Sequence, residues 1–299
     1  MNSTLHAVAS GPGRPGPSRS EEIIAGGEGE LFIRSWRPAG IPRAVLAIVP
    51  GFNSHSGHYL WAAEQFTAMG LAVYAVDLRG RGKSSGPRFH VRHFDDYLAD
   101  VDSLLRLARA REPGLPVFLL GHSAGGVIAT GYTLEHQDEL AGLICESFAF
   151  RVPAPSAVLT LVRWFSGPFP TLPVLKLPNK EFSRLPDVVR ALNADPLIAN
   201  EKQTALTVAQ MLAGNDRLER GFSSLRLPVL IVHGDADKVT VPAGSQIFFD
   251  NAGSQDKTLK LYKGHAHDLL NDDGREQVVA DFKQWIERHL PTQDAAGVA

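Results

Sequence analysis

The chain has 299 residues, of which 44% are hydrophobic and 21% charged, as in an ordinary globular protein. Thirty basic and 32 acidic residues give a formal net charge of −2 at pH 7. This balance argues against a protein that binds nucleic acid by neutralising phosphates. The single cysteine, Cys145, allows no internal disulfide and no thiolate zinc site.

Neither a membrane-spanning helix nor a secretion signal is expected. The sequence has no stretch of 18 or more apolar residues. Residues 1–20 are polar and are interrupted by glycine and proline, which predicts a flexible tail. A second tail is expected over residues 291–299. We therefore expect a cytoplasmic protein, and the sequence leaves its oligomeric state open.

Short apolar runs at regular intervals predict a sheet. The first ordered segment, EEIIAGGEGELFIRSWRP, places two β-like runs around a glycine-rich turn and predicts an antiparallel hairpin. Runs this apolar suit strands covered on both faces, as in a parallel sheet. The later runs cover residues 44–49, 72–76, 117–120, 140–145, 228–232 and 258–262.

Helix-length segments separate these runs. In 94–111, apolar residues recur on one face, acidic residues occupy the first turn and arginines the last, in agreement with the helix dipole. Segment 274–290 has a similar apolar period and follows three capping candidates, Asn271, Asp272 and Asp273. Strands alternating with helices predict a doubly wound α/β fold with a mostly parallel sheet.

The alternation stops between residues 148 and 225. This region has no clear strand run and contains eight prolines, and its early part is apolar on all sides. We interpret 148–225 as an inserted cap, or lid, that is mostly helical. The core then consists of residues 21–147 and 226–290.

One turn carries a recognisable chemical pattern. Residues 117–128, VFLLGHSAGGVI, place a G-x-S-x-G motif between an apolar strand and a helix. The turn is so tight that side chains two residues before and after Ser123 would collide, so Gly121 and Gly125 are needed. The motif presents the Ser123 hydroxyl at the carboxyl edge of the sheet, next to a helix N-terminus. A glycine-rich turn without chemistry is the simpler alternative.

A serine nucleophile needs a base, and the base needs an orienting acid. Asp235 and Asp237 follow one strand, and His265 and His267 follow the next, in the chain order Ser, Asp, His. We predict Asp237 as the acid and His267 as the base. Asp235 is expected to cap a helix, and His265 to be a loop or packing residue. A metal pair of His265 and His267 is disfavoured because no third ligand has suitable spacing.

Two backbone amides are expected to bind the oxyanion that develops when serine attacks a carbonyl. One belongs to Ala124, the residue after the nucleophile. The other is predicted in the loop 50–59, directly after an early strand, where the Phe52 amide is the natural donor. The alternative, that the residues of this loop only form an ordinary turn, is compatible with this role.

Two other polar features are not expected to form sites. The RGRGK segment lacks the spacing of a phosphate-binding loop, and its cations are expected in a solvated loop: Arg79, Arg81 and Lys83. Cys145 is expected to be a buried small hydrophobic residue rather than a reactive thiol.

These motifs resemble the α/β-hydrolase fold, and within it the monoacylglycerol lipase and lysophospholipase branch. The resemblance spans most of residues 43–289 apart from most of the cap. It rests on HSGHY (55–59), VDLRGRGKSSG (76–86), GHSAGG (121–126), GDADKVTVPAGS (234–245) and SQDKTLKLYKGHAH (254–267). The resemblance implies Ser123 as nucleophile, Asp237 as acid and His267 as base, with oxyanion donors at Phe52 and Ala124.

The chain departs from the family pattern at two neighbouring positions. Pro50-Gly51 stands where the family usually has His-Gly, and Phe52 stands where a small residue is common. The Phe52 ring is expected to narrow the acyl pocket. The cap aromatics are expected to line an acyl tunnel, touch a lipid surface or pack on the core: Trp164, Phe165 and Phe169.

The resemblance and the predicted triad together indicate a serine carboxylic-ester hydrolase for lipid-like esters, with monoacylglycerol as the best candidate. No metal or organic cofactor and no nucleic-acid partner is expected; the partners are the small ester substrate and a lipid surface touched transiently by the cap. The alternatives are a short-chain carboxylesterase, a lysophospholipase, a carbon–carbon bond hydrolase or a serine exopeptidase. The exopeptidase would need a cap acid such as Glu181, Asp187 or Asp195. A non-enzymatic binding protein is disfavoured by the intact Ser–Asp–His order, and epoxide hydrolase chemistry by serine at position 123.

Overall fold

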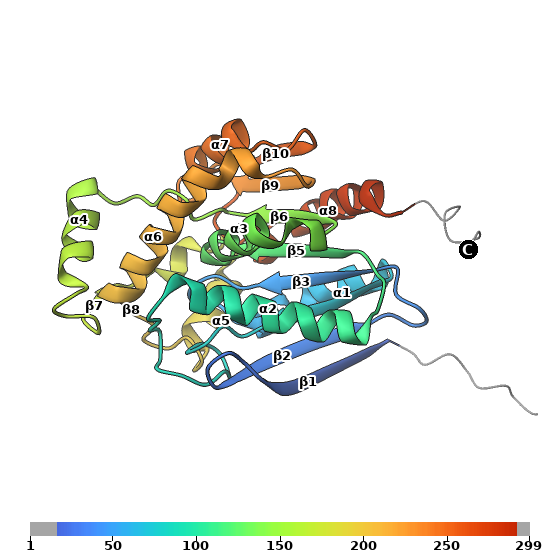
Figure 1. Cartoon of the computed structure of the whole chain (residues 1–299), viewed down its shortest axis with the longest axis horizontal. Helices are drawn as coiled ribbons and strands as arrows, with labels where there is room; N and C mark the ends of the chain where they lie inside the picture. The colour runs from blue at the N-terminus through green and yellow to red at the C-terminus, as the bar shows by residue number, and fades with distance from the viewer. Residues whose placement is uncertain (1–16, 292–299) are drawn as a thin grey trace, which may run out of the picture.

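A mostly parallel sheet of eight strands forms the centre of the molecule, as the apolar runs predict (Figure 1). The computed structural model describes residues 17–291. The strand order is β1-β2-β4-β3-β5-β6-β9-β10; β2 is antiparallel to both of its neighbours and the remaining pairs are parallel. The strands are β1 (Ser18–Ala25), β2 (Glu30–Arg37), β3 (Ala44–Val49), β4 (Leu71–Val76), β5 (Val117–His122), β6 (Gly142–Glu146), β9 (Val229–Gly234) and β10 (Lys257–Tyr262).

The order in which strands are added reverses between β3 and β5. After β3 the chain crosses to β4 on one side, and after β4 it returns past β3 to form β5 on the other. Loops that leave two such neighbouring strands diverge and open a crevice at the carboxyl edge of the sheet. The loop after β3 begins at Pro50, and the turn after β5 holds Ser123. Two of the predicted chemical segments therefore start at this point of reversal.

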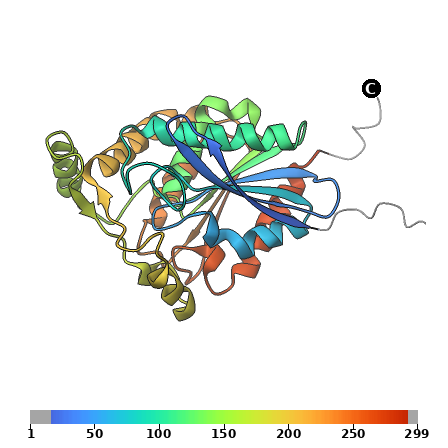
Figure 2. The ribbon, with the colours of Figure 1, turned by 90° about the horizontal axis from the view of Figure 1, so that it is seen from below.

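Two layers of apolar side chains cover the two faces of the sheet. Val45 and Leu119 pack in the layer that contains α2 and α3, whereas Leu46 and Leu120 pack in the layer that contains α1 and α8. Figure 2 shows these helix pairs on opposite sides of the sheet. Strands β3 and β5 are buried on both faces, which explains their continuous apolar sequences.

Helix α2 (Phe94–Arg111) has the predicted bounds. Its N-terminus is fixed by the His93 amide, which donates a hydrogen bond to Asp96 Oδ2 at 2.9 Å. The other core helices are α1 (Leu60–Ala68), α3 (Ala124–His136), α7 (Pro242–Asn251) and α8 (Arg275–His289). Short 3₁₀ turns are η1 (Ser56–Tyr59), η2 (Gln137–Glu139), η3 (Asn179–Glu181), η4 (Phe222–Ser224) and η5 (Leu269–Asn271).

The predicted capping of α8 is wrong. Gly274, with φ of 84°, is the N-cap residue and supplies no side chain. The Asp272 carboxylate instead accepts hydrogen bonds from Arg184 Nε at 2.7 Å and from the Ala266 amide at 3.0 Å. Asp272 therefore joins the core to residues 148–225.

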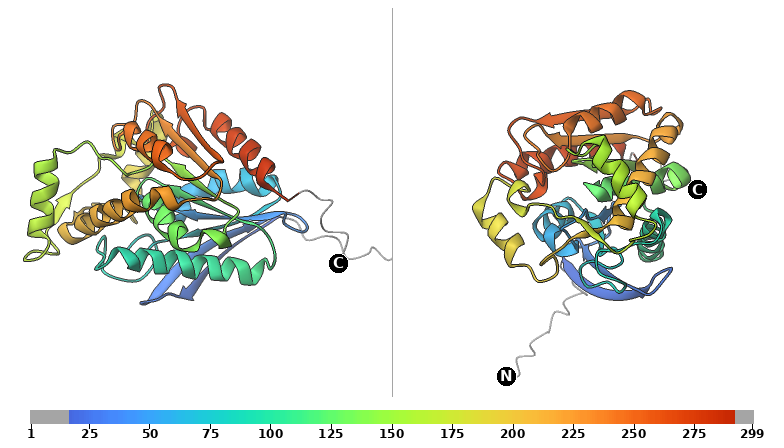
Figure 3. Two further views of the ribbon diagram at one scale, coloured as in Figure 1. Left: turned by 45° about the horizontal axis from the view of Figure 1, so that its top comes forward. Right: turned by 90° about the vertical axis from the view of Figure 1, so that its left-hand side faces the viewer.

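We propose to treat residues 148–225 as the cap. They contain three α-helices, in agreement with the predicted helical character, and a small antiparallel sheet, which the sequence analysis did not predict. These elements are α4 (Ser156–Phe165), β7 (Pro173–Leu175), α5 (Pro186–Ala194), β8 (Gln203–Thr204) and α6 (Ala205–Gly221). Helix α6 packs against α3 and α4 and so joins this region to the core. Figure 3 shows α4 at the outer end of the molecule, away from the sheet.

The predicted tail over residues 1–20 is too long. Residues 18–20 belong to β1, where Ser18 pairs with Arg37. Residues 1–16 of that tail, and residues 292–299 of the second one, lie outside the described part of the chain. Between residues 17 and 291, no helix has the length and apolar character needed to cross a bilayer.

Candidate active site

Ser123 stands in a strained turn between β5 and α3. Its φ of 55° and ψ of −120° lie in a region that residues with a side chain rarely adopt. A side chain at Gly121 would collide with the Gly125 carbonyl, and one at Gly125 would collide with the Val49 carbonyl. The Ser123 amide donates a hydrogen bond to the Glu146 carbonyl at 2.8 Å, which anchors the turn to β6. The glycines therefore serve the steric role that the motif predicts.

The structure brings Asp237 and His267 together. Asp237 lies in the turn after β9 and His267 in the turn after β10, and their Oδ2 and Nδ1 atoms are 2.7 Å apart. The other carboxylate oxygen, Oδ1, accepts hydrogen bonds from the amides of Val239 at 2.7 Å and Thr240 at 3.0 Å. These amides fix the orientation of the carboxylate toward the imidazole.

His233 is a partner of Asp237 that the sequence analysis missed. Its Nε2 lies 3.0 Å from Asp237 Oδ2, and its Nδ1 lies 2.7 Å from Ser245 Oγ. Burial raises the pKa of Asp237, but the charge of His267 and hydrogen bonds from three neighbouring side chains outweigh burial and hold that pKa below its usual value. Asp237 is therefore ionised. A histidine at the end of an apolar strand, four residues before the acid, was the available signal.

Asp235 and His265 take other positions. Asp235 Oδ1 accepts a hydrogen bond from the Gly264 amide at 2.5 Å, so the prediction that it caps a helix is wrong. It connects the turn after β9 to the turn after β10. His265 packs against Tyr262, with ring centroids 5.4 Å apart, in agreement with the predicted packing role.

The His267 ring lies beside the strand that ends at the nucleophile. It packs 4.9 Å from the His122 ring and 5.0 Å, edge to face, from the Phe182 ring of the cap. Burial lowers the pKa of His122 well below its usual value, so this neighbour is neutral. His267 Nε2 is buried and forms no hydrogen bond within residues 17–291, including to Ser123 Oγ.

The predicted oxyanion loop touches the nucleophile. A side chain at Gly51 would come within 2.8 Å of Ser123 Cβ, so the loop after β3 passes directly over the serine turn. Phe52 follows in this loop and is buried. Ala124 is the first residue of α3, and its N–H has no acceptor within the helix.

The RGRGK segment is not the solvated loop that we predict. The exposed fractions of Arg79 and Arg81 are 8% and 1%. Arg79 Nη2 pairs with Asp100 Oδ1 at 2.8 Å, and Arg81 pairs with Glu201 of the cap. Of the three cations, Lys83 alone has a substantially exposed side chain. Cys145 is buried as predicted, and burial raises the pKa of its thiol to about 12.

Within residues 17–291, two groups of histidines and carboxylates bring their ligand atoms close together near the candidate site. In the first, His55 Nε2 and His58 Nε2 lie 2.8 and 2.9 Å from Asp195 Oδ2. Because the Gly57 amide donates to His55 Nδ1, the neutral ring carries its proton on Nε2 and donates it to Asp195. This group is therefore arranged as a hydrogen-bonded contact between cap and core rather than as a set of metal ligands.

The second group contains His122, Glu146 and Asp268, which are all buried behind the serine turn. Burial and the charge of Asp268 raise the pKa of Glu146 well above its usual value. Burial likewise raises the pKa of Asp268. Glu146 Oε1 accepts a hydrogen bond from the Leu270 amide at 3.1 Å, and Asp268 Oδ2 accepts one from Asn271 Nδ2 at 3.0 Å, so both carboxyls have partners within the protein.

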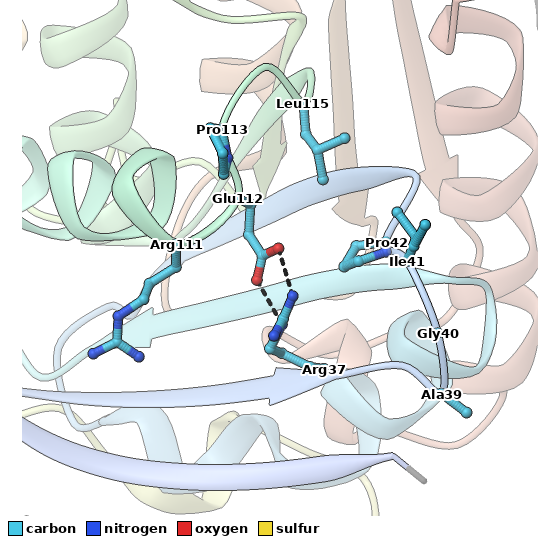
Figure 4. A pocket seen from close by; sticks show the side chains of 9 residues that line it. All are labelled: Arg37, Ala39, Gly40, Ile41, Pro42, Arg111, Glu112, Pro113 and Leu115. Atoms are coloured by element: carbon cyan, nitrogen blue, oxygen red, sulfur yellow. Dashed lines mark hydrogen bonds and ion pairs between the residues drawn. The ribbon is translucent and has the colours of Figure 1, made fainter. Parts of the chain in front are cut away.

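A surface groove of about 710 Å³ lies at the opposite edge of the sheet (Figure 4). Its lining residues 39–42 precede β3, and its lining residues Pro113 and Leu115 precede β5. Arg37 Nε and Glu112 Oε1 form an ion pair in it at 2.7 Å. Because the groove is at the amino ends of these strands, it is separate from the site around Ser123.

Comparisons with known proteins agree with this architecture. The family model described as "Serine aminopeptidase, S33" matches residues 40–274. The chain is 34% identical to a monoacylglycerol lipase of Mycolicibacterium smegmatis over 276 residues, covering 91% of this chain and 99% of the relative. It is 33% identical to the human monoglyceride lipase over 278 residues, covering 89% of each protein.

Solved structures share the fold. The crystal structure of Paleococcus ferrophilus monoacylglycerol lipase has a TM-score of 0.78 and 29% identity, covering 87% of this chain and 99% of the other. A soluble variant of the Saccharomyces cerevisiae monoglyceride lipase, solved with a substrate analog, has a TM-score of 0.82, covering 92% and 96% of the two chains; at 21% identity it supports the fold alone. The chain belongs to the serine aminopeptidase S33 family of α/β-hydrolases, and it is a serine hydrolase similar to monoacylglycerol lipases.

Proposed function

We propose that this protein hydrolyses monoacylglycerols and related lipid-like esters through an acyl-enzyme on Ser123. The observation that carries the proposal is that a strained serine turn and the Asp237–His267 pair lie at the same edge of the sheet, with the His267 ring 4.9 Å from that of His122, the residue before Ser123. The near full-length similarity to proteins named monoacylglycerol lipase supports the ester substrate.

In the proposed mechanism, His267 Nε2 accepts the Ser123 proton while Ser123 Oγ forms a bond to the ester carbonyl carbon. Asp237 holds the imidazole through Nδ1 and stabilises its cation. Catalytic hydrogen bonds often tighten only when substrate is bound, so we expect the Ser123–His267 contact to form at that stage. The amides of Phe52 and Ala124 stabilise the oxyanion.

Collapse of this tetrahedral intermediate breaks the bond to the leaving alcohol. The alcohol oxygen takes the proton from His267, and Ser123 keeps the acyl group. Water then attacks the acyl-enzyme with His267 as base, releasing the fatty acid and returning the proton to Ser123. The reaction needs no group beyond these residues and water.

We also propose that α4 touches a lipid surface transiently. This helix buries none of its residues, and Phe165 at its end lies beside Phe169 of the segment that follows, with ring centroids 6.2 Å apart. The exposed fractions of Leu161, Trp164 and Phe169 are 54%, 80% and 55%, which disfavours packing on the core for these side chains. A cytoplasmic location stays a prediction.

An aminopeptidase activity, which the family description mentions, is less well supported. Such an enzyme would need a free acidic group to bind the substrate amine, but each cap acid considered has a partner. Asp195 binds two histidines, Asp187 pairs with Arg190, and Glu181 lies 3.5 Å from Lys238. We therefore favour ester hydrolysis.

The test is to compare wild type with Ser123→Ala on mono-, di- and triacylglycerols, lysophospholipids and aminoacyl amides. We expect wild type to prefer monoacylglycerol and the variant to lose both turnover and labelling by a fluorophosphonate probe. Ser103→Ala is the matched control, because this serine bonds the Ala99 carbonyl within α2, away from the site. Retained turnover in Ser123→Ala would refute the nucleophile, and a preference for aminoacyl amides would refute the substrate class.

A further inference from the structure

Arg81 and Glu201 form a buried ion pair between core and cap. Their exposed fractions are 1% and 2%, and Arg81 Nη1 donates to Glu201 Oε1. Gln203 completes the group, since it accepts from Arg81 Nη2 at 2.6 Å and donates to Glu201 Oε1 at 2.6 Å. A charge pair this deeply buried needs such close partners to offset its desolvation.

The same carboxylate oxygen holds the predicted oxyanion loop. Glu201 Oε1 accepts a hydrogen bond from the Asn53 amide at 2.9 Å, and Asn53 directly follows Phe52. Asn53 has a φ of 52°, in the left-handed region that is costly for a residue with a side chain. Its side-chain amide also donates to Asn179 Oδ1 at 2.8 Å and to the Leu177 carbonyl at 3.3 Å. All three acceptors belong to the cap.

Arg81 contacts Phe52 itself. The guanidinium carbon lies 4.0 Å from the centroid of the Phe52 ring, in cation–π geometry. The ion pair therefore meets the loop at two consecutive residues, through the Phe52 ring and through the Asn53 amide. The peptide plane between Phe52 and Asn53 defines the ψ angle of Phe52. Holding that plane restrains the preceding peptide, which carries the Phe52 N–H, the proposed oxyanion donor.

We propose that Glu201, held in place by Arg81, is a positioning residue that sets the direction of the Phe52 amide and thereby couples cap docking to oxyanion stabilisation. This inference rests on the proposed function, in which Phe52 is an oxyanion donor. The coupling needs no contact between Glu201 and the substrate. It requires only that the acceptor for Asn53 N–H stays where the cap places it.

Three variants separate the hydrogen-bond acceptor from the buried charge. Glu201→Gln keeps an oxygen that can accept from Asn53 but leaves Arg81 without a counter-charge. Glu201→Leu removes both the acceptor and the counter-charge. Arg81→Met combined with Glu201→Leu replaces the ion pair by apolar groups, which is often tolerated in stability, and still lacks the acceptor.

The measurements are kcat and KM for p-nitrophenyl butyrate per active site, the Ki of an alkyl trifluoromethyl ketone, and Tm. We expect Glu201→Leu to lower kcat about 10- to 100-fold with KM nearly unchanged, and to raise the ketone Ki by a similar factor, because the ketone adduct carries an oxyanion. Glu201→Gln should keep kcat within about 3-fold of wild type despite a lower Tm. The double variant should regain Tm but not kcat.

Asp100→Asn is the matched control, because it breaks the buried pair with Arg79 in the same RGRGK segment without touching Phe52 or Asn53. We expect it to lower Tm and leave kcat and the ketone Ki unchanged. Recovery of kcat with Tm in the double variant, or loss of kcat in Glu201→Gln equal to that in Glu201→Leu, would overturn the proposal. Failure of wild type to hydrolyse any ester would instead refute the proposed function, so the two outcomes are distinguishable.

Discussion

Two aspartates two residues apart have different environments in the turn after β9. Asp237 is held by two backbone amides and faces His267, whereas Asp235 accepts from the Gly264 amide. A side-chain amide at position 237 cannot accept hydrogen bonds at both of its ends. It would therefore lose either the Val239 contact or the correct orientation of the imidazole.

We expect Asp237→Asn to lower kcat about 10³- to 10⁴-fold and Asp235→Asn to lower it less than about 3-fold. The check is steady-state kinetics on p-nitrophenyl butyrate, with Tm measured to confirm folding. Equal losses in both variants would mean that the turn, rather than the 237 carboxylate, carries the effect. A larger loss in Asp235→Asn would exchange the two roles.

The environment of a single residue could be predicted where its neighbours in the sequence determine it. The Ser123 turn follows from glycines that lie two residues to either side, so its geometry is local. Arg81 was misjudged because its partner Glu201 is 120 residues away, in a cap with no pattern to place it. A charged residue in a loop is usually solvated, and burial of a pair becomes visible only when the partner's position is known.

At the scale of elements, apolar periodicity predicts those segments whose pattern is set by packing. Helix α2 has the predicted bounds because one face of it packs on the sheet and both ends carry local signals. Strands β7 and β8 were missed because they are short and pair with each other outside the main sheet. Helix α4 shows the opposite case, in which apolar residues are present but do not face the core.

This exposed helix leads to a prediction about lipid binding. Leu161→Ser combined with Trp164→Ser removes apolar area that would insert into a lipid surface, at roughly 1.5–3 kcal/mol per fully buried side chain. We expect binding to phosphatidylcholine vesicles to weaken about 10-fold or more, and turnover of a soluble short-chain ester to stay within about 2-fold. Vesicle co-sedimentation measures the first and steady-state kinetics the second.

Ile41 provides the control, because it is 92% exposed but lines the groove at the opposite edge of the sheet (Figure 4). Ile41→Ser should leave vesicle binding unchanged. An equal loss of binding in both proteins would mean that lipid contact depends on general surface apolarity and not on α4.

At the scale of the whole molecule, buried polar contacts join the cap to the core in addition to apolar packing. The cap contributes Asp195, Glu201 and Arg184, whose core partners include His55, Arg81 and Asp272. Apolar contacts join them as well: Phe148, Phe150, Met211, Leu218 and Phe222 belong to the large core cluster, and Phe182, Leu192, Ile198 and Val239 form a smaller one. The strength of a contact made by an ionised carboxylate depends on its protonation state. The stability contributed by these cap–core contacts should therefore change with pH.

Asp195 provides the test of this dependence. The hydrogen bond from His58, together with that from His55, holds the pKa of Asp195 below its usual value. Its folded-state pKa is lower than its unfolded-state pKa, so its stabilisation is present above the unfolded pKa of about 3.9 and is lost as pH falls through the folded pKa. Asp195→Asn removes this contribution. Its carboxamide has a single oxygen, so it cannot accept from the Leu197 N–H, which donates to Asp195 Oδ1 at 2.8 Å, and from the two histidines at Oδ2 at the same time.

We therefore expect Asp195→Asn to have a lower Tm than wild type at pH 7, with the difference shrinking as pH falls from about 5 toward 3. Thermal unfolding of both proteins across this range measures it. Asp187→Asn is the control, since the exposed Asp187 pairs with Arg190 at the surface and should change Tm little at any pH. A constant Tm difference between Asp195→Asn and wild type from pH 7 to pH 3 would show that the carboxylate charge does not hold the cap to the core, and that the loss comes from packing alone.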